Sequence, residues 1–249
     1  HGMKPLEKLQ GSMTRECTED FGALKSYVGN YAISASLEDP SYVSSLKRIH
    51  RHYFAAISWH SELAHSKGPF QIAYANCNDE IIIRLGEVVS DLGSCVFNWI
   101  NGNYKASKII LRVCIESFIR ATSAVENKDQ LTEKNVYNLF DVASSQAIFA
   151  SCKSCYEALH ADYKMLCADV HTATLQNMQH LTSLAELPAF EKEKSESAED
   201  IIVRASSNIN SAFCIMFNRF YHSMHHRNKE NILNGVARKN RPLISGMQS

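Results

Sequence analysis

The side chains of this sequence that are best suited to chemistry form a charged pair inside an otherwise apolar segment. Arg112 and Glu116 stand four residues apart in the run from Ile109 to Ile119, and residues at this spacing share one face of an α-helix. A buried guanidinium or carboxylate is costly unless it is paired. Two interpretations follow: an ion pair that fixes how a core helix packs, or a polar active centre, since charged groups with perturbed pKa values gather at functional sites.

A second polar group follows further along the chain, on one face of a helical segment, and consists of His160, Lys164, Cys167 and His171. His171 comes where that helix is expected to end. The carbonyl end of a helix favours a protonated imidazole. His171 is therefore either a capping residue or a group that transfers a proton near neutral pH.

Other chemistry has less support in the sequence. Cys152 and Cys155 form a Cys-x-x-Cys pair, but no strand precedes it, as a redox motif requires, and no second pair completes a zinc site. The sequence holds no His-Glu-x-x-His, no phosphate-binding glycine loop and no Gly-x-Ser-x-Gly. We therefore expect two helical thiols one turn apart, and neither a metal ion nor a cofactor.

Apolar residues recur every three to four positions along most of the chain, which predicts an all-α fold, a helical bundle of about six to eight helices. The segment 103–126 is apolar on nearly every side and is expected at the centre of the bundle. Asn101-Gly102 precedes it, so it should lie antiparallel to the helix before it. The other expected helices are 41–66, 79–100, 131–140, 145–170 and 198–228.

Length and composition are typical of one globular domain. The chain has 249 residues, of which 45% are hydrophobic, and Lys+Arg and Asp+Glu number 26 each, so no global basic field is expected. His1-Gly2 is interpreted as a cloning scar before a single domain over 3–249. No signal peptide or membrane-spanning run is recognised, which predicts a cytoplasmic protein without membrane contact whose eight cysteines are reduced. Within the domain we expect a helical extension over 18–68, a core over about 79–228, a charged connector over 187–198 and a basic C-terminal tail over 229–249.

The two polar groups together resemble the pattern of the bacterial HEPN-like helical families, which are found beside toxin–antitoxin and abortive-infection systems. In these families a Leu-Arg-x-x-x-Glu pattern on an apolar helix is followed by Tyr-x-x-Leu-Ser-x-x-Val-His at a helix end. Cys167 replaces the serine here, and the resemblance covers about 79–174. The matching residues are Leu111, Arg112, Glu116, Tyr163, Leu166, Val170 and His171.

The resemblance implies a helical bundle, commonly a homodimer, that cleaves RNA without a metal. Arg112 would hold the scissile phosphate, His171 would act as general acid and base at the ribose 2′-hydroxyl, and Glu116 would orient them. The better-known signature of HEPN ribonucleases, Arg-x(4–6)-His within one helix, is met by Arg219 and His225, although a polar residue usually follows the arginine. That segment is interpreted as the exposed C-terminal end of a helix. A second interpretation is a basic patch that contacts RNA.

The predicted function is therefore that of a metal-independent ribonuclease, a toxin or effector in bacterial phage defence with an antitoxin or defence protein as partner. The alternative is a catalytically inert helical module that dimerises and acts as a sensor or antitoxin-binding scaffold. A third interpretation is a bundle that binds a nucleotide or small ligand through Arg112. Convergence of Arg112, Glu116 and His171 in an open cleft would favour catalysis, whereas a sealed ion pair would favour the scaffold.

Overall fold

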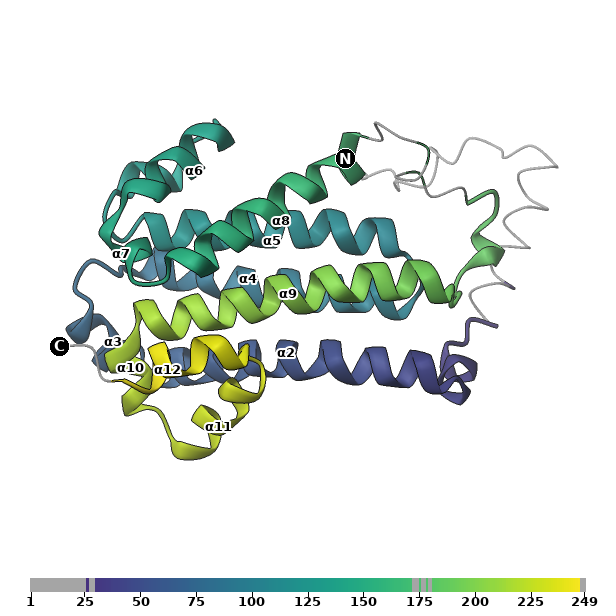
Figure 1. Cartoon of the computed structure of the whole chain (residues 1–249), viewed down its shortest axis with the longest axis horizontal. Helices are drawn as coiled ribbons and strands as arrows, with labels where there is room; N and C mark the ends of the chain where they lie inside the picture. Colours follow the sequence, from purple (N-terminus) through teal and green to yellow (C-terminus); the bar gives the residue numbers. More distant parts are fainter. Residues whose placement is uncertain (1–25, 27–29, 172–174, 176–177, 179–180, 247–249) are drawn as a thin grey trace, which may run out of the picture.

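The computed structural model describes residues 26, 30–171, 175, 178 and 181–246 (Figure 1). Within these residues all regular secondary structure is helical, which confirms the all-α prediction. The described residues form eleven α-helices, more than the six to eight expected, because several short helices connect the long ones. None of the described helices is long and apolar enough to cross a membrane.

Five long helices run along the molecule and form its body (Figure 1). The shorter helices are α3 (Lys67–Ala73), α6 (Val136–Ser145), α7 (Ala147–Ala150), α10 (Asn218–Ser223), α11 (His226–Asn234) and α12 (Arg241–Ser245). Helix α6 lies beside α7 at one edge, and α10 to α12 gather near α2 at the opposite edge (Figure 1). The long helices are α2 (Pro40–His65), α4 (Asp79–Ile100), α5 (Tyr104–Ser123), α8 (Lys153–His171) and α9 (Lys192–Met216).

Local sequence signals set the starts of the first long helices. Asp39 caps α2 by accepting hydrogen bonds from the backbone N–H groups of Ser41 and Tyr42. Asn78 caps α4 by accepting from the N–H of Ile81, so the cap lies one residue before Asp79, which is the first residue of the helix.

The turn between α4 and α5 depends on a glycine. Gly102 has a φ of +76°, and a Cβ there would lie 2.2 Å from the carbonyl oxygen of Ala189. Only glycine can adopt this positive φ and lie this close to the Ala189 carbonyl without strain. The short connection makes α4 and α5 neighbours in the bundle, as the Asn101-Gly102 turn predicts.

The most enclosed helix is α9, and not the segment 103–126 that the sequence places at the centre. From Ala198 to Ile215 nearly every side chain of α9 is buried, including serines and asparagines. Ser206 and Ser211 satisfy their hydroxyls by donating to the carbonyl oxygens of Ile202 and Ser207 in the same helix. Serine hydroxyls that are satisfied within the helix can be buried at low cost. The polar residues of α9 therefore gave no indication that this helix is buried.

The C-terminal third differs from the sequence expectation. In place of one helix over 198–228, the chain forms α9, α10 and α11, so Arg219 and His225 do not share a helix. Residues 192–197 of the expected connector are the first turns of α9. The expected basic tail packs back on the bundle through α11 and α12, and Ile232, Val236 and Ile244 are buried. Only residues 247–249 of that segment lie outside the described residues.

Two other helices begin later than the sequence suggests. The expected helix over 131–140 is replaced by α6, which begins at Val136 after a cap at Asn135. The segment 145–170 divides into α7 and α8. The seven described cysteines are free thiols. Cys152 and Cys155 are both buried, and burial raises the pKa of Cys152 to about 12, so this Cys-x-x-Cys pair is unsuited to redox chemistry.

Candidate functional site

The two charged residues singled out on α5 are joined through a tyrosine of α8. Arg112 Nη2 donates to the Tyr163 hydroxyl at 2.5 Å, and this hydroxyl lies 3.4 Å from Oε2 of Glu116. The direct ion pair is longer, at 3.9 Å between Arg112 Nη2 and Glu116 Oε2. Tyr163 therefore connects Arg112 to Glu116 and ties α8 to α5.

Glu116 has a closer cationic partner one turn further along α5. Arg120 Nη2 donates to Glu116 Oε1 at 3.0 Å, while Arg120 Nη1 donates to the carbonyl oxygens of Gln130 and Glu133. These two carbonyls belong to the segment that leads into α6. The carboxylate thus lies between two arginines, and the cluster carries a net positive charge.

Helix α8 holds the Arg112 guanidinium in a fixed place. The Cζ atom of Arg112 lies 4.7 Å from the centre of the Tyr163 ring, and Arg112 Nε donates to Cys167 Sγ at 3.4 Å. A guanidinium above an aromatic face is attracted by the ring quadrupole. Nη1 has no hydrogen-bond partner among the described residues. Burial, opposed by the charge of Arg112, raises the pKa of Tyr163, so its hydroxyl stays protonated at neutral pH.

Arg112 faces a groove between α5, α6 and α8 with a volume of about 1010 Å³, which we call the α5–α6–α8 groove. Its charged lining consists of Arg112, Lys134 and Lys164 against Asp141, and therefore favours an anionic ligand. Glu116 does not line the groove. The remaining lining residues are Asn135, Val136, Tyr137, Asn138, Phe140, Ser144, Tyr156, His160, Tyr163 and Cys167.

The groove also contains a histidine, His160, whose neutral ring can accept a proton. His160 stacks on Phe140, with ring centres 4.6 Å apart and an angle of 15° between the planes. Burial, aided by the charge of Lys164, lowers its pKa below the usual 6.5. The sequence places His160 on the same helical face as Lys164 and Cys167 but gives it no role, because its position in the groove depends on how α6 packs.

The other residues singled out in the sequence lie elsewhere or are not fully described. His171 is the last residue of α8, and its side chain lies outside the described residues. Arg219 is exposed on α10. His225 caps α11. Its ring Nδ1 accepts a hydrogen bond from the backbone N–H of Arg227, and its backbone N–H donates to the Glu62 carboxylate. His225 is therefore at the start of a helix, and the interpretation of this segment as an exposed C-terminal helix end is wrong.

Arg120 and Tyr137 also help to build this site, although neither is assigned from the sequence. Arg120 could have been recognised from the sequence, because it follows Glu116 at the same four-residue spacing at which Glu116 follows Arg112. Tyr137 has no comparable signal and is identified by its 88% exposure in the groove wall. Among the described residues, no group of three or more His, Cys, Asp or Glu side chains is arranged to hold a metal ion.

Comparisons with protein-family models, with curated proteins and with solved structures find no match to this chain. The class that its fold defines is that of an all-α helical bundle with a basic, aromatic-lined groove.

Proposed function

We propose that this protein is a metal-independent ribonuclease that binds RNA in the α5–α6–α8 groove. The observation that carries the proposal is the placement of Arg112 at this groove, held by Tyr163 and Cys167 while Nη1 has no partner among the described residues. A preorganised donor aimed at a developing negative charge is the largest single contribution in many enzymes. Arg112 would bind the scissile phosphate through Nη1.

The rest of the groove suits single-stranded RNA. Lys134 and Lys164 would contact neighbouring phosphates, which supply most of the affinity in nucleic-acid binding. Tyr137 and the stacked pair Phe140 and His160 offer aromatic faces. Unpaired bases stack on such faces in RNA-binding proteins.

A proton has to leave the ribose 2′-hydroxyl for cleavage to occur without a metal. The 2′-oxygen attacks the phosphorus, the bond to the 5′-oxygen breaks, and the leaving oxygen takes up a proton from the protonated histidine or from water, giving a 2′,3′-cyclic phosphate and a 5′-hydroxyl. Neutral His160 can accept the first proton. In the families that this sequence resembles, the histidine corresponding to His171 has that role. Glu116 and Tyr163 are positioning residues for Arg112.

By the same resemblance, we propose a toxin or effector of bacterial phage defence that acts as a homodimer and is controlled by an antitoxin or another defence protein. A homodimer is expected to appear in light scattering at twice the mass of one chain. A single-chain mass at all concentrations would contradict the dimer and leave the ribonuclease proposal unaffected.

The test is cleavage of a labelled single-stranded RNA with EDTA present. We expect Arg112→Ala to lower the rate by about 100-fold or more, and either His160→Gln or His171→Gln to lower it by a similar factor. Lys153→Ala is the control, because this lysine is 78% exposed on α8 and does not line the groove. Circular dichroism verifies the fold of each variant. Cleavage that persists in folded Arg112→Ala, or no cleavage by the wild type, would overturn the proposal.

One observation favours the second candidate, an inert helical interaction module. Two of the three guanidinium nitrogens of Arg112 already have partners within the protein, and Tyr163 is buried. A cluster of this kind also fixes how two helices pack. This module would bind RNA no better in the wild type than in Arg112→Ala, and fluorescence anisotropy with the same labelled RNA distinguishes the two candidates.

A further inference from the structure

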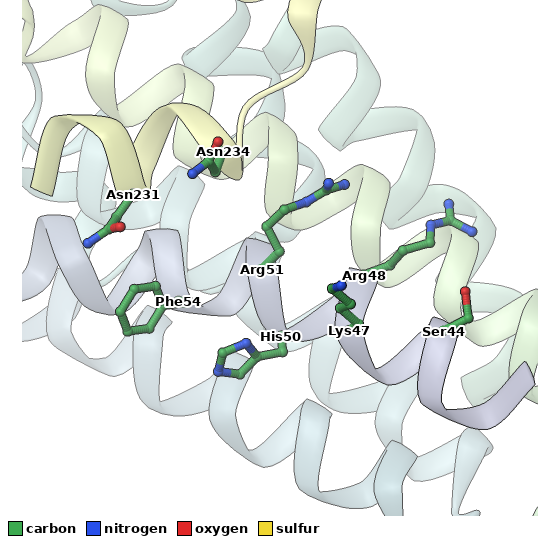
Figure 2. A pocket seen from close by; sticks show the side chains of 8 residues that line it. All are labelled: Ser44, Lys47, Arg48, His50, Arg51, Phe54, Asn231 and Asn234. Carbon is green, nitrogen blue, oxygen red and sulfur yellow. The ribbon is translucent and has the colours of Figure 1, made fainter. Parts of the chain in front are cut away.

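A second concave surface lies away from this groove, between the first half of α2 and α11 (Figure 2). It has a volume of about 350 Å³, and we call it the α2–α11 cradle. Figure 2 shows Arg48 and Arg51 extending from α2, with Asn231 and Asn234 coming from α11. The lining residues are Ser44, Lys47, Arg48, His50, Arg51, Phe54, Asn231 and Asn234.

Two cations of the cradle have no charged partner in the part of the chain that the structure describes. Arg48 is paired with the buried carboxylate of Glu199 at 2.7 Å and with Asp200 at 3.6 Å. Lys47 and Arg51 form no ion pair with any described residue, and α2 contains only one acidic residue, Glu62. The cradle therefore presents uncompensated positive charge to solvent, which attracts an anion.

The floor of the cradle is a rigid part of the core. His52 Nδ1 lies 2.9 Å from the carbonyl oxygen of Gly235. Asn210 of α9 donates to the carbonyl oxygens of His52 and Gly235 and accepts from Trp59 Nε1. Because these groups are buried, they hold α11 against α2 and fix the position of Asn231 and Asn234 above Arg51 and Phe54.

The uncharged lining has the chemistry that recognises a base. Phe54 is 41% exposed and stacks with His50, with ring centres 5.7 Å apart. An exposed aromatic face stacks with a nucleobase, and asparagine carboxamides form paired hydrogen bonds with base edges such as that of adenine. Cations, an aromatic face and carboxamides thus occur together in a cavity of about 350 Å³.

We propose that the α2–α11 cradle binds a nucleoside phosphate, with the phosphate at Lys47 and Arg51 and the base between Phe54 and the two asparagines. The ligand is either a free nucleotide or one nucleotide unit of a single-stranded RNA, since both offer the same phosphate and base. The proposal goes beyond the ribonuclease proposal and does not rest on it, because none of its residues lines the α5–α6–α8 groove.

The test measures binding to the full chain by calorimetry with ATP, AMP and adenosine, and by fluorescence anisotropy with a short labelled single-stranded RNA. We expect AMP or ATP to bind more tightly than adenosine, and Arg51→Glu and Lys47→Glu each to raise the Kd by about tenfold. Phe54→Ala should weaken binding of all three compounds. Lys153→Glu, a charge reversal of an exposed lysine outside both cavities, should leave the Kd unchanged.

Each remaining outcome decides the proposal. RNA binding that is weakened by Arg51→Glu, without binding of free nucleotides, supports the cradle as a site for one unit of RNA. No binding of nucleotides or RNA by the wild type would overturn the proposal, as would wild-type affinity in both Arg51→Glu and the milder Arg51→Gln. Displacement of the nucleotide by poly-glutamate with equal potency would also overturn it and indicate a purely electrostatic protein interface. Because the readout is binding, absence of cleavage does not affect it.

Discussion

The α5–α6–α8 groove and the α2–α11 cradle both present arginines, but they hold them differently. Arg112 is fixed by Tyr163 and Cys167, and its side chain is only 23% exposed. Arg51 is exposed and has no ion-pair partner among the described residues, and it is the backbone beneath it that is rigid. A fixed guanidinium costs no reorganisation when charge develops, which suits chemistry. An exposed guanidinium suits attraction of an anion, where its freedom to adjust is useful.

A large loss of stability is expected from a methyl group added at Gly235, which packs against the α2 backbone beside the cradle. A Cβ at Gly235 would lie 2.3 Å from the Cβ of Ala55, which cannot move without its helix. We expect Gly235→Ala to lower the free energy of unfolding by about 1–3 kcal/mol, as overpacking does, and to weaken nucleotide binding. Urea denaturation measures the first effect and calorimetry the second.

Gly68→Ala is the matched control, because no atom lies within 4 Å of the Cβ position at Gly68. It should leave the free energy of unfolding unchanged or raise it slightly. Equal stability of Gly235→Ala and Gly68→Ala would show that α2 and α11 are not held together as described.

Neutral substitutions of the two arginines compare the sites directly. Arg112→Gln removes the guanidinium that donates hydrogen bonds to the Tyr163 hydroxyl and to Cys167 Sγ. It should lower the free energy of unfolding by about 1–3 kcal/mol. Arg51→Gln removes no described hydrogen bond and should change that free energy by less than about 0.5 kcal/mol. Denaturant midpoints of the two variants test the difference. Similar losses in both would contradict the contrast between a fixed and an exposed guanidinium.

A smaller effect concerns pH, since a histidine with a lowered pKa lies beneath the cradle (His52) and another lines the groove (His160). Burial is the main cause for both His52 and His160. The unfolded chain therefore binds more protons just below pH 6.5, so the free energy of unfolding falls as the pH drops from about 6.5 to each lowered value. His52 is 5% exposed and His160 is half-buried, so His52→Gln should flatten this dependence more than His160→Gln does. Denaturation at several pH values measures it, and an unchanged slope in His52→Gln would be the contrary result.

The parts of this fold that local sequence determines could be predicted. The α4–α5 hairpin follows from the Asn101-Gly102 turn, and the meeting of Arg112 with Glu116 follows from their four-residue spacing. The bridge through Tyr163 lies beyond such reasoning, because it depends on how α8 packs on α5. The same holds for the cradle, which joins residues of α2 to residues of α11 far along the chain.

No glycine or proline in the sequence indicates the break between α9 and α10. Phe217, at the break, packs its ring against Phe70, Tyr74 and Phe213, with each pair of ring centres 5.1 Å apart. Tertiary packing of this kind overrides local helix propensity. The expectation of one continuous helix over 198–228 first fails at this break. Arg219 and His225 are separated further along, where Met224 is extended between α10 and α11.

The most direct test of the account measures RNA cleavage in EDTA and nucleotide affinity in the same two variants, Arg112→Gln and Arg51→Gln. We expect Arg112→Gln to lose about 100-fold or more in cleavage rate and to retain its nucleotide affinity. We expect Arg51→Gln to bind nucleotide about tenfold more weakly. If Arg112→Gln cleaves like the wild type, or if one substitution abolishes both cleavage and nucleotide binding, the division between a groove for chemistry and a cradle for binding is contradicted.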